Sequence, residues 1–145
     1  MRIRKFNESD FQDLYDTLSD PEVMKYIEAT FSQEKTKEFL FNTGLCDNPR
    51  IYVAENDEGK YVGYVIFHDY DNQSIEIGWL LKRSQWNKGY AKKLTEIMIE
   101  QAKAKGKSVI IECAPEQFVT KHIAELFNFQ YQGEIDGCSV YKLEN

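Results

Sequence analysis

The sequence has no long apolar run. No stretch approaches the roughly 20 consecutive apolar residues that a membrane-spanning helix needs. The first ten residues, MRIRKFNESD, also lack the apolar core of a secretory signal. From these absences we predict a soluble, cytoplasmic protein that has no membrane partner.

Cysteine and histidine are scarce. The three cysteines, Cys46, Cys113 and Cys138, are odd in number and widely spaced, which argues against a disulfide framework and against a zinc site. We therefore predict no bound metal. A nucleophilic cysteine would need a base beside it, and His68 and His122 are the only histidines. Small buried apolar residues are the more ordinary interpretation of the cysteines.

The chain also lacks the positive charge that nucleic-acid binding requires. Its 18 Lys and Arg against 24 Asp and Glu give a net charge of −6, so we expect no nucleic-acid partner. An acidic protein is compatible with a cationic substrate such as an amine. One local stretch departs from this balance: it contains Lys82, Arg83, Lys88, Lys92 and Lys93 and no acid among them. Such a stretch is either a solvated helix face or a binding site for an anion.

A chain of 145 residues predicts one domain, residues 1–145, because roughly 68–70% of its unfolded surface can be buried. Apolar periodicity and turn residues predict strands and helices in an alternating order. The expected strands are 3–6, 50–55, 61–68, 74–81, 108–113, 129–135 and 138–143; the expected helices start at Ser9, at residues 19–22, at Ser32, at 89 and at Pro115. The predicted fold class is α/β (α+β), with one mixed, mostly antiparallel sheet of six to seven strands flanked by helices.

Particular residues mark the expected helix ends. Ser9 with Gln12 reads as a capping box, and Pro21 suits the first position of the second helix. Pro115 is expected in the same role at the start of the last helix, and Gly106 suits the end of helix 89–105. The segment from strand 75–81 to strand 108–113 should be a right-handed crossover between parallel strands.

The stretch W-N-K-G-Y-A, residues 86–91, opens the longest predicted helix. A helix N-terminus presents free N–H groups and about half a positive charge, so a tight turn before it can hold a pyrophosphate. Gly89 permits close backbone approach, Ala91 permits close helix packing, and Lys88 with Lys92 adds charge. Glycine before a helix is common, so the motif alone is weak evidence.

In its context this stretch resembles the acyl-CoA loop of the GNAT N-acetyltransferase superfamily, [Q/R]-x-x-G-x-[G/A], and within it the Rim-type branch, where tryptophan often takes the first position. The loop follows I-E-I-G-W-L-L, residues 75–81, as in that branch. The second family motif, Asn-x-x-Ser before Leu-Gly-Phe, corresponds to Q-F-V-T at 117–120 and F-N-F at 127–129. Asn87 and Asn128 stand where glycine is frequent, and asparagine is the next best residue for a left-handed backbone.

The resemblance implies that acetyl-CoA is a co-substrate and that the fourth and fifth strands splay to admit its pantetheine arm. Leu80 and Lys82 would offer backbone groups to that arm. The remaining implied cofactor-binding residues lie in the loop and in the second motif: Asn87, Lys88, Gly89, Tyr90, Ala91, Lys92, Gln117 and Thr120.

Transfer to an amine needs a neutral nucleophile, so a general base is the expected catalytic group. The resemblance implies Glu76, on the fourth strand, or Glu112, on the fifth; a third possibility is that neither carboxylate is essential. The tyrosine that serves as general acid in bacterial N-terminal acetylating members corresponds to Ala124 here. Tyr90 and Tyr131 are near in sequence, although core packing or simple exposure is the more ordinary fate of both.

The acceptor is expected between the N-terminal helices and the last hairpin, as a small-molecule amine or a peptide or protein N-terminus. The candidate residues there are Tyr26, Glu28, Phe31, Glu134 and Asp136. The chain is expected to be a monomer or a homodimer. Two competing hypotheses are a non-catalytic acyl-CoA sensor of the same fold and an interaction domain without a CoA site.

Overall fold

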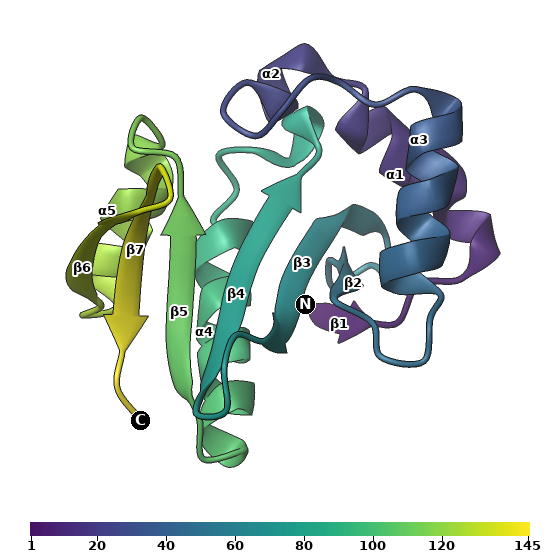
Figure 1. The fold of residues 1–145 in the computed structure, drawn as a ribbon. Coiled ribbons are helices and arrows are strands. Elements are labelled where there is room, and N and C mark those ends of the chain that lie inside the picture. Colours follow the sequence, from purple (N-terminus) through teal and green to yellow (C-terminus); the bar gives the residue numbers. More distant parts are fainter.

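Seven strands form one mixed sheet in the computed structural model, which describes residues 1–145, and helices cover both of its faces (Figure 1). The strands are β1 (Arg2–Arg4), β2 (Ile51–Glu55), β3 (Tyr61–Asp69), β4 (Ser74–Leu81), β5 (Ser108–Cys113), β6 (Gln130–Ile135) and β7 (Cys138–Leu143). The α-helices are α1 (Phe11–Leu18), α2 (Pro21–Met24), α3 (Gln33–Phe39), α4 (Tyr90–Ala104) and α5 (Phe118–Leu126).

The strand order across the sheet is β1-β2-β3-β4-β5-β7-β6. Strands β4 and β5 are parallel, with α4 as the crossover between them, and all the other neighbours are antiparallel. The predicted fold class is therefore confirmed. None of the helices combines the length and the apolar character that a bilayer span requires.

The second and third helices begin where their capping residues predict. Asp20 accepts a hydrogen bond from the Glu22 amide, and Pro21 occupies the first turn of α2. Ser32 accepts from the Lys35 amide and starts α3 in the same way.

The residues that cap the start of the first helix differ from the expected ones. The capping box consists of Asn7 and Asp10, not of Ser9 and Gln12, and it opens a 3-10 turn that leads into α1. Asp10 is held in place because Arg4 donates two hydrogen bonds to its carboxylate, at 2.9 and 2.8 Å. The side-chain amide of Gln12 instead donates a hydrogen bond to the carboxylate of Asp16, one turn further along the helix.

Helix α5 also starts later than predicted, at Phe118 instead of Pro115. The Gln117 amide donates to the Ala114 carbonyl, and the Phe118 amide donates to the Glu116 carbonyl. These two bonds close a turn directly after β5, so the helical hydrogen-bond pattern begins only at its end.

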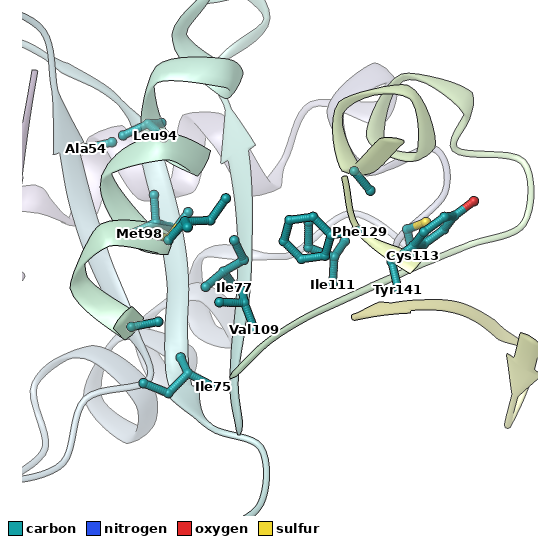
Figure 2. Packing of buried hydrophobic residues seen from close by; sticks show 14 of the residues in the cluster. Ala54, Ile75, Ile77, Leu94, Met98, Val109, Ile111, Cys113, Phe129 and Tyr141 are labelled. Carbon is teal, nitrogen blue, oxygen red and sulfur yellow. The ribbon is translucent and has the colours of Figure 1, made fainter. Parts of the chain in front are cut away.

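Two apolar cores lie on opposite faces of the sheet. Helices α1 and α3 cover β2 and β3 on one face, in a cluster that includes Leu14, Leu40 and Val53. Helices α4 and α5 cover the other face, where Leu94 and Met98 pack onto the central strands (Figure 2). No helix covers the first face over β4, β5 and β7 (Figure 1).

Strands β4 and β5 pair over three residues and then separate. The pairs are Ser74 with Ser108, Ile75 with Val109 and Glu76 with Ile110. Beyond the pair of Glu76 with Ile110, β4 continues to Leu81 and β5 continues to Cys113 without pairing with each other. This is the splay that was expected between the fourth and fifth strands, and it opens toward the start of α4 (Figure 1).

Candidate active site

The loop between β4 and α4 has an unusual backbone that its sequence explains. After a 3-10 turn over Arg83–Gln85, Asn87 has φ 61° and Gly89 has φ 79°, both in the left-handed region. Asparagine and glycine adopt that region at low cost, and this backbone was expected for Asn87. The indole N–H of Trp86 donates to the Leu81 carbonyl at 3.1 Å and fixes the start of the loop on the end of β4.

The backbone N–H groups of residues 87–92 have no acceptor within the chain. The first amide to donate is that of Lys93, which bonds to the Gly89 carbonyl at 3.3 Å. Gly89 is the N-cap of α4 and has no side chain to satisfy these donors. Exposed Lys88 and Lys92 lie beside them, and neither forms an ion pair. Free amides, a helix dipole and two cations are the donor set that a pyrophosphate fits.

The free backbone on the open side of β4 is that of Trp79 and Leu81. The expectation that Leu80 and Lys82 would provide it is wrong, because the Lys82 amide donates to Val62 of β3 at 3.0 Å. Backbone groups in an antiparallel strand alternate between its two neighbours, so Leu80, opposite Tyr64, also faces β3.

The same alternation is visible at the other end of β4. The Gln73 carbonyl accepts from the Ser108 amide of β5, so odd-numbered residues face that side. Trp79 lies beyond the last paired residue, Glu76, and its N–H and C=O face the splay. Leu81 presents its N–H there, while its carbonyl is bound by the Trp86 indole.

Glu76 and Glu112, the two candidate bases, lie on the same face of the sheet at the closed end of the splay. Glu76 is opposite Ile110 in the last pair of β4 and β5, and Glu112 follows two residues later on β5. Residues two apart on a strand project from the same face, here the face on which no helix covers β4 and β5. Sequence placed both carboxylates on neighbouring strands, and the fold brings them together.

The carboxyl group of Glu76 is half-buried, and its burial raises its pKa above the ordinary value. Nearby His68 and Arg50 oppose this increase, while the negative charge of Glu112 adds to it. The Nε2 atom of His68 lies 3.6 Å from Oε1 of Glu76. A carboxyl group with a raised pKa at the point where two strands separate is a candidate general base.

Glu112 has a partner that the sequence did not reveal. The hydroxyl of Tyr70, in the bend between β3 and β4, donates to Oε1 of Glu112 at 2.9 Å. This hydrogen bond raises the pKa of Tyr70 to about 12, so the phenol stays protonated at neutral pH. The two residues are 42 positions apart, and no spacing rule connects them.

The second motif borders the splay from the other side. The side chain of Gln117 accepts a hydrogen bond from the Ala114 amide at 2.7 Å, which stabilises the turn between β5 and α5. Thr120 follows in the first turn of α5 and is half-buried. Ala124 is fully buried, Tyr90 packs partly against the core, and Tyr131 is 54% exposed.

The candidate acceptor residues separate into three groups. Tyr26 and Glu28 are exposed after α2, and Glu28 forms an ion pair with Lys35. Glu134 and Asp136 are exposed on the β6–β7 hairpin, at the same end of the sheet as α2 (Figure 1). No hydrogen bond or ion pair joins the two sides.

Phe31 does not belong to an exposed acceptor surface. It is buried in the core between the N-terminal helices and the sheet, and the centroid of its ring lies 5.6 Å from that of Phe39. Its expected place among the acceptor residues is therefore corrected to a packing role.

Comparisons with known proteins agree with this geometry. The family described as "Acetyltransferase (GNAT) domain" matches residues 1–130. The uncharacterized N-acetyltransferase YnaD of Bacillus subtilis is 30% identical over 141 residues, which cover 94% of this chain and 82% of YnaD.

Solved structures show the same fold. A GNAT-family acetyltransferase from Bacillus anthracis superimposes with a TM-score of 0.84 at 26% identity, covering 98% of this chain and 93% of that one. A spermidine N-acetyltransferase from Vibrio cholerae, solved with CoA and spermine, gives a TM-score of 0.79 at 19% identity over 97% and 92% of the two chains. The acetyl-CoA complex of yncA, a putative acetyltransferase from Salmonella typhimurium, gives 0.71 at 17% over 99% and 93%. With its splayed strands, its free-amide loop and these relatives, the chain belongs to the GNAT acetyltransferase family.

Proposed function

We propose that this protein is an acetyl-CoA-dependent N-acetyltransferase that transfers the acetyl group directly to a primary amine in a ternary complex. The observation that carries the proposal is the row of unpaired amides at residues 87–92, placed at the open end of a splay whose closed end holds Glu76 and Glu112. The loop fits the anionic end of the cofactor, and the carboxylates fit the chemistry of an amine.

In this proposal, different residues of the chain bind different parts of the cofactor. The amides of Asn87, Gly89 and Ala91–Lys92, with the adjoining Tyr90, hold the pyrophosphate, and Lys88 and Lys92 screen its charge. When bound, acetyl-CoA supplies an activated thioester carbonyl.

The pantetheine arm lies along β4 and is recognised by strand addition. Trp79 and Leu81 take the role first expected of Leu80 and Lys82, because their backbone groups face the splay. Gln117 and Thr120 border the arm from α5. The structures of relatives bound to CoA or acetyl-CoA support this choice of cofactor.

The acceptor is a small-molecule amine or a peptide or protein N-terminus, with a Rim-type enzyme as the finer hypothesis. Removing the proton at pH 7 costs roughly 4.6 kcal/mol for a lysine-type amine and roughly 1.1 kcal/mol for an α-amine. A base at Glu76 or Glu112 therefore contributes more for the first class. Tyr26, Glu28, Glu134 and Asp136 are the proposed acceptor-side residues, and the exposed acids among them suit a cation.

The test is a thiol-release assay with acetyl-CoA and a panel of polyamines, amino acids and peptides with free N-termini. We expect amine-dependent release of CoA and acetylation of one class of amine. Thermal unfolding serves as the binding assay, since a ligand at one hundred times its Kd stabilises by about 2.7 kcal/mol. Stabilisation without release on any amine would contradict catalysis, and no stabilisation by millimolar acetyl-CoA would contradict cofactor binding.

A further inference from the structure

Three side chains form a polar row on the face of the sheet that α1 and α3 cover only in part. Arg50 precedes β2, His68 lies in β3, and Glu76 lies in β4 directly opposite His68. His68 and Glu76 project from the same face because they are cross-strand partners. Their side chains are only 13% and 21% exposed, so solvent screens the contact between them weakly.

The backbone decides which nitrogen of His68 carries a proton. The Nδ1 atom lies 2.9 Å from the carbonyl oxygen of Asp69, and a carbonyl oxygen only accepts hydrogen bonds. Nδ1 must therefore be the donor, in the neutral ring as well as in the charged one. The neutral ring then has its lone pair on Nε2, which is the atom that faces Glu76 at 3.6 Å.

Arg50 adds a positive charge against the same ring. Its Nη2 atom is 3.3 Å from Nδ1 and 3.2 Å from Nε2 of His68. An atom so nearly equidistant from both nitrogens lies over the ring face, because an in-plane position would collide with Cε1.

Nε2 therefore faces the carboxyl group of Glu76 across this gap, and a single proton between Nε2 and Oε1 can be bonded to either atom. We propose that His68 is a positioning residue that shares one proton with Glu76, and that this sharing makes Glu76 the base for the acceptor amine. The inference deepens the proposed acetyl transfer and rests on it.

Glu112 has the complementary role. Its Oε1 accepts a hydrogen bond from the Tyr70 hydroxyl, which holds the carboxyl group in position. Its fixed negative charge attracts the ammonium form of the acceptor and favours protonation of Glu76 next to it. From β7, Cys138 faces the same two carboxylates, and its thiol has a raised pKa, through burial first and then through their charges. The thiol therefore stays neutral and does not compete as the base.

The proton balance of the step is complete with these groups. The ammonium gives one proton to the His68–Glu76 pair, and the freed nitrogen lone pair forms the new C–N bond. The C–S bond breaks with its electrons on sulfur, and the pair returns its proton to the thiolate. The second nitrogen proton leaves to solvent, so an ammonium and a thioester become an amide, a thiol and one proton.

The first experiment needs no substrate. Nitrogen-15 NMR of the histidine rings at pH 9, where an ordinary imidazole is neutral, should show the Nδ1-protonated tautomer for His68. Glu76→Gln should change the His68 ring shifts, whereas Asp57→Asn, at an exposed site in the β2–β3 turn, should leave them unchanged. Since acetyl-CoA is absent, this result stands or falls separately from the proposed function.

The second experiment is the pH profile of kcat/KM for His68→Gln. The positive charge of protonated His68 lowers the pKa of Glu76, so its removal should shift the acidic limb of the profile to higher pH. The variant should lose more activity at pH 6.5 than at pH 9, and taking the ratio to wild type cancels the titration of the amine itself. His122→Gln, in α5, should match wild type at every pH.

Two results would overturn the proposal. One is an Nε2-protonated neutral tautomer of His68. The other is a pH-independent loss in His68→Gln, which is what a merely structural role would produce. A panel that yields no acetylated amine would contradict the proposed function and leave the NMR result to decide the shared proton.

Discussion

Arg83 donates two hydrogen bonds to Asp20, at 3.0 and 2.8 Å, and so joins the turn before the phosphate-binding loop to the start of α2. Asp20 is also the N-cap of that helix. Lys82, which directly follows β4, makes a second contact of this kind. Its Nζ atom donates a hydrogen bond to the carboxylate of Asp13 in α1 at 2.8 Å. The proposed cofactor loop and the proposed acceptor helices are thus tied together, although more than 60 residues separate them in sequence.

Replacing Arg83 by Gln should weaken this connection. We expect the KM for the acceptor amine to rise several-fold, because α2 and the residues after it lose their fixed position against the loop. The Kd for acetyl-CoA should change less, since Arg83 precedes the free amides. Steady-state kinetics and calorimetry measure the two quantities, and Lys60→Gln, in an exposed pair with Glu58, is the control. A larger effect on the cofactor than on the acceptor would refute this coupling.

Gly89→Ala should separate cofactor binding from folding. A Cβ at Gly89 meets nothing within 4 Å, so the fold tolerates it, but φ 79° costs an L-residue about 1–2 kcal/mol. We expect a loss of stability of this size and a loss of acetyl-CoA affinity of more than tenfold, because the loop relaxes and its amides turn away.

Gly106→Ala is the matched control for that variant. Gly106 ends α4, has φ 70°, and also has open space around its Cβ position. Its substitution should cause a similar loss of stability in chemical denaturation with unchanged acetyl-CoA binding. Equal loss of binding in both variants would assign the effect at Gly89 to helix stability alone.

The two free cations beside the loop predict a salt-dependent affinity. The double substitution of Lys88 and Lys92 by Gln should weaken acetyl-CoA binding roughly three- to thirtyfold at low salt, as each exposed charge at a helix N-terminus contributes about 0.3–1 kcal/mol. The difference from wild type should shrink at high salt, because exposed charges are screened. Lys103→Gln with Lys105→Gln, at the other end of α4, changes the net charge equally and should bind normally in the same titration.

The ion pairs around Arg4 predict sensitivity to acid. Burial opposes the ionisation of Asp10, but hydrogen bonds from Arg4 and Asn7 outweigh it and lower the pKa; hydrogen bonding from Arg4 likewise lowers the pKa of Glu55. Carboxyl groups with a lowered folded-state pKa stabilise the protein above their unfolded pKa, near 4, and lose this contribution as pH falls through the folded value. The free energy of unfolding should therefore decrease progressively below about pH 5.

Urea unfolding of Arg4→Gln tests this explanation. We expect a loss of roughly 2–4 kcal/mol at pH 7, since removing Arg4 leaves nearly buried Asp10 without a cation and nearly buried Glu55 with exposed Arg2 alone. The variant should lose less further stability on acidification than wild type does. Arg2→Gln removes an exposed cation from the same Glu55 and should cost less than 1 kcal/mol. Parallel acid profiles for wild type and Arg4→Gln would contradict the role of Arg4.

Local sequence determined the elements and the loop of this protein. Asp20 with Pro21, Ser32 and Gly106 mark helix ends because caps and turns depend on interactions over a few residues. The W-N-K-G-Y-A stretch likewise determined its left-handed positions, since only glycine and asparagine adopt that backbone at low cost. The capping box was misplaced because Arg4, from another element, fixes Asp10.

Tertiary structure decided which atoms meet. The register of β4 against β3 turned the backbone of Trp79, not of Leu80, toward the splay, and a shift of one residue would reverse that choice. Packing of the N-terminal helices buried Phe31. The bend after β3 carried Tyr70 to Glu112 across 42 residues, and cross-strand pairing set His68 against Glu76. The sequence by itself determined where an anion can bind, because that site is local backbone; the proposed proton chemistry depends on side chains from separate strands, which only the folded sheet brings within reach.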